Sequence, residues 1–477
     1  MSFRGKETIN RSEVKMRKIS VLVIFAVLGF AFSSAVYADS AAGDVRAEID
    51  ALKARITQLE AKPASQQAAV PVVPAPAAEI PTPSWPVSGI YTVPDTKDVG
   101  KLTGIPALEG TKIRGWIDTN YVVNFNHPAR TTVNANQATS IVKGHDISVE
   151  GRTFDVHDES FNLSLAEVEI EKVPDVGGVG YKLDIAYGET QDIIVDTIRG
   201  SLGPSAAADS VTDFDKTFQH ASVSYVAPWG KGVRFDAGKF VTHIGGETIE
   251  TVKNWNYSHS FFYTYAIPFQ DTGVHVSYPW TDKFYTDLYV LNGWNVTIDN
   301  NTGKTIGPAI GWTATPWLSV YANYLGGPEQ NDTGRNLRHL FDTQVVLGPF
   351  YDRWNFMVNY DYGSEQKAIN AITANVSNAS WWGVTGYARY KINDMFEPSL
   401  RVEYFRDAKG MQTGIKQGLV GYTLTWNTKL AASKGSLLLL RPEIRYDRSS
   451  DRFFTDDRRF HNNKDQLTVE LGVSWLF

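Results

Sequence analysis

Apolar and polar residues alternate with a period of two from about Thr111 to the C-terminus, which predicts a succession of β-strands. In the last of them, Leu467, Val469 and Leu471 fall on one face and Glu470 on the other. We count sixteen segments with this pattern, at 112–126, 160–173, 181–188, 218–227, 233–241, 271–279, 284–292, 305–313, 317–325, 338–348, 354–363, 380–392, 399–407, 418–428, 436–447 and 465–477.

The connections between these segments alternate between short and long. The short ones, such as 227–232 (APWGKG) and 348–353 (GPFYDR), carry the Gly, Pro or Asp of tight turns. The long ones, such as 127–159, 189–217 and 242–270, are polar and irregular. An even number of strands joined in this way is typical of a transmembrane β-barrel, in which both ends of the barrel sequence lie on the short-turn side.

Alternation alone also fits a soluble β-sandwich, so the composition of the two faces has to decide. Aromatic residues crowd the segment ends, as in YPW, TPW and SWW, where a membrane barrel carries its interfacial girdles. A closed barrel also satisfies the backbone of every strand in hydrocarbon. We therefore predict an all-β fold, a transmembrane antiparallel β-barrel of about 16 strands. Within 161–170 the apolar residues change from odd-numbered to even-numbered positions, which predicts a β-bulge near Ala166 or Glu167.

The N-terminal region has the pattern of a secretory signal peptide. Val21 to Phe32 is apolar, Arg17 and Lys18 precede it, and SSAVYADS follows, so we assign 1–38 as the signal peptide. Met16 is an alternative start. A retained membrane helix is the other interpretation, although about 20 apolar residues are needed to span a bilayer. The absence of Cys excludes a lipoprotein anchor.

A short heptad pattern follows in 39–62, which we interpret as a periplasmic coiled-coil helix. It serves as an oligomerisation stalk, or as a surface helix, or as a helix that docks on another partner. The Ile and Leu positions favour two strands in an isolated peptide, but tethering to a larger assembly can impose three. A Pro/Ala-rich linker occupies 63–108, and the barrel occupies 109–477. In the helix of 39–62, the apolar residues that repeat with the heptad and would form the seam of a coiled coil are Val45, Ile49, Leu52, Ile56 and Leu59.

Composition argues against several classes of function. The chain has 477 residues, no Cys and a net charge of −6, so it lacks disulfides and the basic field of a nucleic-acid-binding protein. Neither a phosphate-binding glycine loop nor a zinc-ligand spacing is present, and we expect no cofactor and no metal. His275 and Ser277 share a strand face, but without an orienting acid or oxyanion donors they do not make a catalytic site. We therefore expect no enzyme activity.

Four stretches of the chain resemble the OmpL-like β-barrel porins of the Gram-negative outer membrane. They are GWIDTNYVVNFN, YSHSFFYTYAIPFQDTGVHVSYP, YVLNGWN and the closing strand that ends at Phe477. The resemblance covers about 110–477 and implies a water-filled channel for passive diffusion of small hydrophilic solutes or ions. The alternative is a barrel that anchors its N-terminal stalk to peptidoglycan or to a periplasmic partner.

The implied location is the outer membrane, with the stalk in the periplasm and lipid and lipopolysaccharide around the barrel. We expect a homo-oligomer, with a trimer favoured. The final strand, with Trp475 and Phe477, resembles the signal by which the barrel-assembly machinery recognises its clients.

Charged residues at inward positions are candidates for the pore lining. Six basic and seven acidic residues are nearly balanced, which predicts weak ion selectivity. In several strands the basic residue precedes the acidic one, so the charges form either two tiers that create a field in the lumen or salt bridges that only rigidify the wall. The candidates are Arg114, Asp118, Lys182, Asp184, Arg234, Asp236, Arg401, Glu403, Arg441, Glu443, Arg445, Asp447 and Glu470.

The third long connection is unusually aromatic for a solvated loop. In general porins the loop at this ordinal position folds into the barrel and narrows it. That resemblance makes Glu247 and Glu250 candidate constriction carboxylates, with Lys253 opposite them. The alternative is an external loop that packs on its neighbours or on lipopolysaccharide.

Overall fold

The computed structural model describes residues 98–128, 149–201, 211–370, 375–433, 435–456 and 461–477. The predicted signal peptide, the coiled-coil seam (Val45, Ile49, Leu52, Ile56 and Leu59) and most of the linker lie outside these residues. Their assignments, and the interpretations of the N-terminal helix, stay predictions. Just before the barrel the chain forms a short helix, α2 (Val99–Thr103), and a 3-10 turn, η1 (Pro106–Leu108).

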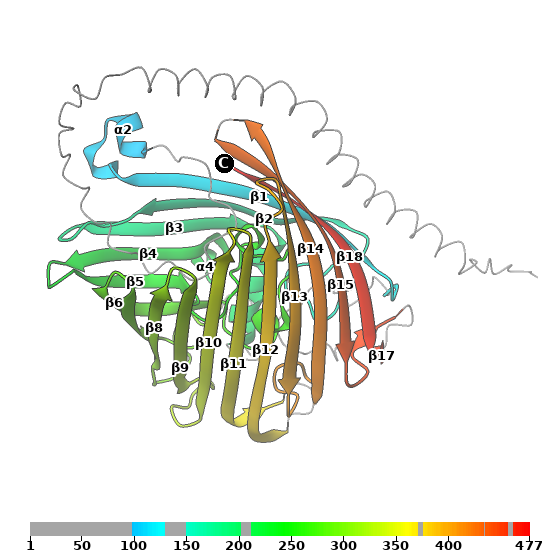
Figure 1. The fold of residues 1–477 in the computed structure, drawn as a ribbon. Coiled ribbons are helices and arrows are strands. Elements are labelled where there is room, and N and C mark those ends of the chain that lie inside the picture. The colour runs from blue at the N-terminus through cyan, green and yellow to red at the C-terminus, as the bar shows by residue number, and fades with distance from the viewer. Residues whose placement is uncertain (1–97, 129–148, 202–210, 371–374, 434, 457–460) are drawn as a thin grey trace, which may run out of the picture. The chain divides into compact units, whose positions relative to one another are not determined.

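Sixteen strands pair antiparallel in one closed barrel, which confirms the predicted fold class (Figure 1). Each barrel strand pairs with the barrel strands before and after it in the sequence, β15 pairs with β18, and β1 closes the ring against β18. The barrel strands are β1 (Thr111–Asn124), β2 (Phe161–Lys172), β3 (Val179–Tyr187), β4 (Phe218–Ala227), β5 (Val233–Val241), β6 (Gln270–Thr281), β7 (Phe284–Leu291), β8 (Thr305–Thr315), β9 (Leu318–Pro328), β10 (Leu337–Phe350), β11 (Trp354–Ile369), β12 (Val376–Tyr390), β13 (Phe396–Asp407), β14 (Gln417–Ser433), β15 (Ser436–Ser449) and β18 (Asp465–Leu476).

Some strands run further than their hydrophobic pattern predicts. β11 continues to Ile369, well past the predicted end at residue 363. The added segment is polar, so apolar alternation does not mark it, yet it still pairs with β12, as in Glu365 with Ala379. A two-stranded hairpin of β16 (Phe454–Thr455) and β17 (His461–Asn463), between β15 and β18, was not predicted.

The barrel turns its apolar face outward and its polar face inward. On β14, Tyr422 and Leu424 are exposed on the outside, whereas Thr423, Thr425 and Asn427 are buried inside. This inversion of the usual protein interior is what lipid on the outside and a polar lumen on the inside require. Among the described residues, no helix is long and apolar enough to cross a bilayer.

The parity shift in β2 corresponds to a real irregularity. Asp118 pairs with Leu165 and Thr119 with Leu163, so Ser164 is the extra residue, two positions before the predicted Ala166. The bulge keeps Phe161 and Leu163 on the outer face and brings Glu167 and its alternate neighbours to the inner face.

The seam between the first and last strands depends on a close approach at Gly115. Gly115 N donates to Phe477 O at 2.8 Å, and Phe477 N donates to Gly115 O at 2.9 Å. The Phe477 ring lies directly over the glycine: a Cβ at Gly115 would come within 2.6 Å of Phe477 Cζ and 2.8 Å of Glu167 O. The C-terminal aromatic therefore fills the space that the missing side chain leaves.

We expect Gly115→Ala to destabilise the barrel by about 1–3 kcal/mol, because the ring and the backbone carbonyl must both shift. The measurement is the temperature at which the purified barrel loses its folded, fast-migrating band in gel electrophoresis. Gly386→Ala on β12 is the matched control, since its Cβ would meet only Val402 O, at 3.9 Å. Equal melting temperatures for the two variants would contradict the seam packing.

Candidate functional site

The long connection between β5 and β6, residues 242–269, lies inside the barrel, and we call it the inner loop. It contains a 3-10 turn, η3 (Thr251–Lys253), and a short helix, α5 (Phe261–Tyr265). Its side chains reach inward-facing residues of the wall: Tyr257 Oη donates to Asp118 Oδ2 at 3.1 Å, and Asn256 Nδ2 donates to Thr425 Oγ1 at 2.7 Å. The green segment behind β10–β13 in Figure 1 belongs to this part of the chain.

Three arginines of the wall bind the carbonyl groups of the inner loop. Arg401 on β13 donates to the carbonyl oxygens of residues 258 and 259, Arg445 on β15 to that of 259, and Arg441 on β15 to those of 251 and 254. All three side chains are at most 1% exposed. They face the interior but are covered by the loop, so they are not in contact with a solvent-filled channel.

Wall carboxylates bind the amide groups of the same loop. Glu443 Oε2 accepts from Tyr257 N at 2.8 Å and from Ser258 N at 3.2 Å, and Glu403 Oε2 accepts from Phe261 N at 2.5 Å. The loop lacks the cross-strand partners that the barrel strands have, and a buried peptide group without a partner costs about 1–3 kcal/mol. The alternating charges of β13 and β15 supply both kinds of partner.

The predicted constriction residues divide between two sides of the loop. Glu247 is buried, its Oε1 2.9 Å from Arg401 Nη1, and its Oε2 accepts from Ser260 N at 2.8 Å. Burial alone would raise the pKa of Glu247, but the Arg401 guanidinium and the Ser260 hydrogen bonds hold it below its ordinary value. Glu250 pairs with Lys253, at 3.0 Å, and both face β2 and β3 instead.

An apolar core inside the barrel packs on the helix of the inner loop. Phe261, Phe262 and Tyr265 of α5 pack with Trp381 of β12 and Phe405 of β13. The Trp381 indole also donates to the carbonyl of residue 266, at 3.1 Å. The core extends to β7, β9 and β10, through Leu291, Leu325 and Leu340, and to segments of other long connections, so much of the interior is filled with side chains.

The remaining predicted lining residues also point inward. Arg114 and Lys182 each pair with Glu169, Lys182 also lies 3.4 Å from Asp184, and Arg234 pairs with Asp236. Asp118 accepts from Thr251, Tyr257 and Ser474. Glu470 accepts from Asn120, and Asp447 pairs with Arg445 and Arg152.

In the pairs of Arg114, Lys182, Arg234 and Lys253 the base is the more accessible partner, although Glu171 beside Arg114 keeps 23% of its exposure. The side chains of Arg114, Lys182, Arg234 and Lys253 keep 21–31% of their exposure, whereas those of Glu169, Asp184 and Asp236 keep at most 5%. The same order holds for the pair of Arg338 with Glu365 and that of Lys429 with Glu397.

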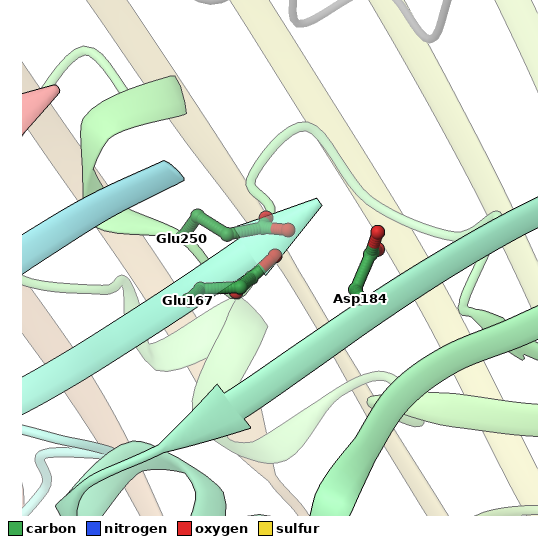
Figure 2. A group of neighbouring side chains, drawn as sticks. All are labelled: Glu167, Asp184 and Glu250. Carbon is green, nitrogen blue, oxygen red and sulfur yellow. The ribbon is translucent and has the colours of Figure 1, made fainter. Parts of the chain in front are cut away.

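Sequence analysis missed the acidic residues of β2. Glu167, Glu169 and Glu171 alternate along the strand and sit beside Arg114 and the lysines, with Glu167 and Glu169 buried. The signal was present, because the parity after the bulge puts these three on the polar face. Glu167 forms a group with Asp184 of β3 and Glu250 of the inner loop, which we call the three-carboxylate cluster (Figure 2).

His275 has the acidic neighbours that the sequence did not reveal. Its Nδ1 lies 2.9 Å from Asp236 Oδ2, and its Nε2 lies 3.3 Å from Asp287 Oδ1. Since both ring nitrogens face carboxylates, neither is directed at Ser277 as a general base would be. The arrangement is a buried ion-pair network of the wall.

No curated protein matches the chain. Solved structures with a similar fold include OprB of Pseudomonas putida (10% identity, TM-score 0.47, 81% of this chain and 99% of that chain). They also include the outer membrane channel DcaP of Acinetobacter baumannii (10%, 0.46, 77% and 97%) and OmpT of Vibrio cholerae (11%, 0.46, 77% and 97%).

A family profile described as "Putative beta-barrel porin-2, OmpL-like" matches residues 110–475, from just before β1 to the penultimate residue of β18. Because this match covers the whole barrel, the chain belongs to that family and is an outer-membrane porin, not an enzyme.

Proposed function

We propose that the barrel conducts small hydrophilic solutes through a narrow passage beside the inner loop. The observation that carries this proposal is the position of the loop, which is bound to the wall formed by β13–β15 and leaves accessible charges toward β2–β5. Side chains of the loop and of its apolar core occupy much of the cross-section, which supports a solute limit smaller than that of an unobstructed barrel of sixteen strands.

We further propose a weak preference for anions. The numbers of inward basic and acidic residues are nearly balanced, so count alone gives little selectivity. The accessible charges are not balanced. Arg114, Lys182, Arg234 and Lys253 reach solvent, whereas of the carboxylates that pair with them only Glu171 does, with 23% of its side chain exposed. A passing ion is influenced most by the charges nearest to it in water.

We also infer a homo-oligomer, with a trimer favoured. The support is the heptad seam from Val45 to Leu59, because a helix this short is stable only when it associates with others. Contacts with lipopolysaccharide, with the barrel-assembly machinery through Trp475 and Phe477, and with peptidoglycan through the stalk stay predictions.

Replacing residues 248–262 with a short Gly/Ser linker should raise single-channel conductance several-fold in planar bilayers. The change opens the cross-section, and the wall arginines that lose their partners become hydrated, so no unpaired charge stays buried. The matched control replaces 331–335, an exposed connection between β9 and β10, which should leave conductance unchanged. An unchanged conductance in the first variant would overturn the proposal that the inner loop narrows the passage.

Lys182→Gln should lower the anion-to-cation permeability ratio, measured from the reversal potential in a KCl gradient. The substitution removes an accessible positive charge and leaves Asp184 and Glu169 with less compensation. Lys391→Gln, which removes an equal charge from an exposed turn where Lys391 pairs with Asp394, is the control. A wild-type channel that favours cations, or a ratio that does not move in Lys182→Gln, would contradict the proposed preference.

A further inference from the structure

We propose that the three-carboxylate cluster of Glu167, Asp184 and Glu250 binds a divalent cation, with Ca²⁺ as the best fit. One carboxylate oxygen from each residue lies within 4.8 Å of the others, and Figure 2 shows the three side chains converging from β2, β3 and the inner loop. Oxygens bound to one Ca²⁺ at 2.3–2.6 Å can be up to about 5 Å apart, so the group has the right size for a shared ion.

The cluster has carboxylate oxygens that the protein leaves unsatisfied. Glu167 is 2% exposed and Asp184 is 0% exposed. Among the described residues, Glu167 Oε1 and both oxygens of Asp184 accept no hydrogen bond, although Lys182 Nζ lies 3.4 Å from Asp184 Oδ2. Buried carboxylate oxygens without donors are costly, and a hard cation is the ligand that would compensate them.

A neutral side chain on a different strand points into the same cluster. Gln219 of β4 is fully buried, and its Nε2 lies 3.2 Å from Glu250 Oε1 and 3.4 Å from Glu167 Oε2. Its Oε1 has no partner in the described part of the chain. A 180° turn of the amide exchanges the two atoms and places a carbonyl oxygen, a good Ca²⁺ ligand, beside the two carboxylates.

The charges around the cluster favour a doubly charged cation. The connected network contains five carboxylates, Glu167, Glu169, Glu171, Asp184 and Glu250, and three bases, Arg114, Lys182 and Lys253. With all of these groups ionised, five negative and three positive charges leave two negative charges without a counterpart, and one Ca²⁺ would balance them. Four of the five carboxylates are buried, and Glu171 keeps 23% of its exposure. Uncompensated charge in a buried site is strongly unfavourable.

The two lysines are compatible with such an ion. Both Lys182 and Lys253 lie 3.4 Å from Glu169 Oε2, so this carboxylate outside the cluster binds them both. Lys253 also takes one oxygen of Glu250, at 3.0 Å, which leaves the second oxygen of that residue for the ion. Water in the lumen would complete the six to eight oxygen ligands that Ca²⁺ prefers.

A bound ion would join the inner loop, through Glu250, to β2 and β3. The proposal does not require that the barrel conducts solutes, because it concerns binding alone. It is therefore tested on the full chain in detergent, with Ca²⁺ as the probe in isothermal titration calorimetry and Tb³⁺ as a luminescent substitute. Trp116 is a suitable sensitiser, since Lys253 Nζ lies 4.8 Å from its ring and 3.0 Å from Glu250.

We expect one saturable site per chain, with Tb³⁺ emission that Ca²⁺ abolishes. Glu167→Gln and Asp184→Asn should each weaken Ca²⁺ binding at least tenfold. Gln219→Leu should also weaken Ca²⁺ binding, although it changes no charge. This variant still tests the proposal if a carboxylate variant does not fold. Glu397→Gln, which alters a buried carboxylate paired with Lys429 away from the cluster, should bind as the wild type does.

Two results would overturn the assignment. One is a wild-type protein without saturable Ca²⁺ binding, which would mean that the cluster is only hydrated or protonated. The other is unchanged binding in folded Glu167→Gln, Asp184→Asn and Gln219→Leu, which would place the ion elsewhere on the chain. A barrel that binds Ca²⁺ but does not conduct would contradict the proposed function and leave the cation site standing.

Discussion

The interior of this barrel depends on how the peptide groups of the inner loop find hydrogen-bond partners. The loop runs across the lumen without forming a strand, so its amides and carbonyls cannot be satisfied by a neighbouring strand. Charged wall residues replace that neighbour: Glu443 and Glu403 accept from the amides of residues 257, 258 and 261, and Arg401, Arg441 and Arg445 donate to carbonyls. Charge-assisted hydrogen bonds of this kind are about twice as strong as neutral ones.

This use of charge divides the inner wall into two regions. On β13 and β15 a first group, Arg401, Glu403, Arg441, Glu443 and Arg445, is covered by the inner loop and holds it. On β1–β5 a second group of bases, Arg114, Lys182 and Arg234, remains accessible, and Glu169, Asp184 and Asp236 are buried beneath them. A solute in the lumen therefore contacts far fewer charged side chains than the number of inward-facing charged residues suggests. The three-carboxylate cluster lies where the loop meets the second region, so an ion bound there would connect the two.

Much of the fold could be predicted from the sequence, because period-two alternation and the lengths of the connections both follow directly from a barrel in lipid. The alternation gave sixteen strands with the inward residues on the correct face. Alternation could not predict the C-terminal end of β11, because Glu365 and its neighbours pair with β12 in a polar segment that has no apolar alternation. Nor could it give the partners of Arg401 or Glu443, since these lie some 140 or more residues away in an irregular loop whose path has no periodic signal. Glu167 was missed for a different reason, because the extra residue at Ser164 shifts the parity on which the inward assignment depends.

Hydrogen–deuterium exchange of the inner loop tests the central claim most directly. If wall carboxylates bind the amides of Tyr257, Ser258 and Phe261, these three protons should exchange orders of magnitude more slowly than an unstructured peptide, at rates approaching those of the barrel strands. Exchange at the rate of a free peptide, in a barrel whose strands remain protected, would show that the loop is not held by the wall and would contradict this account.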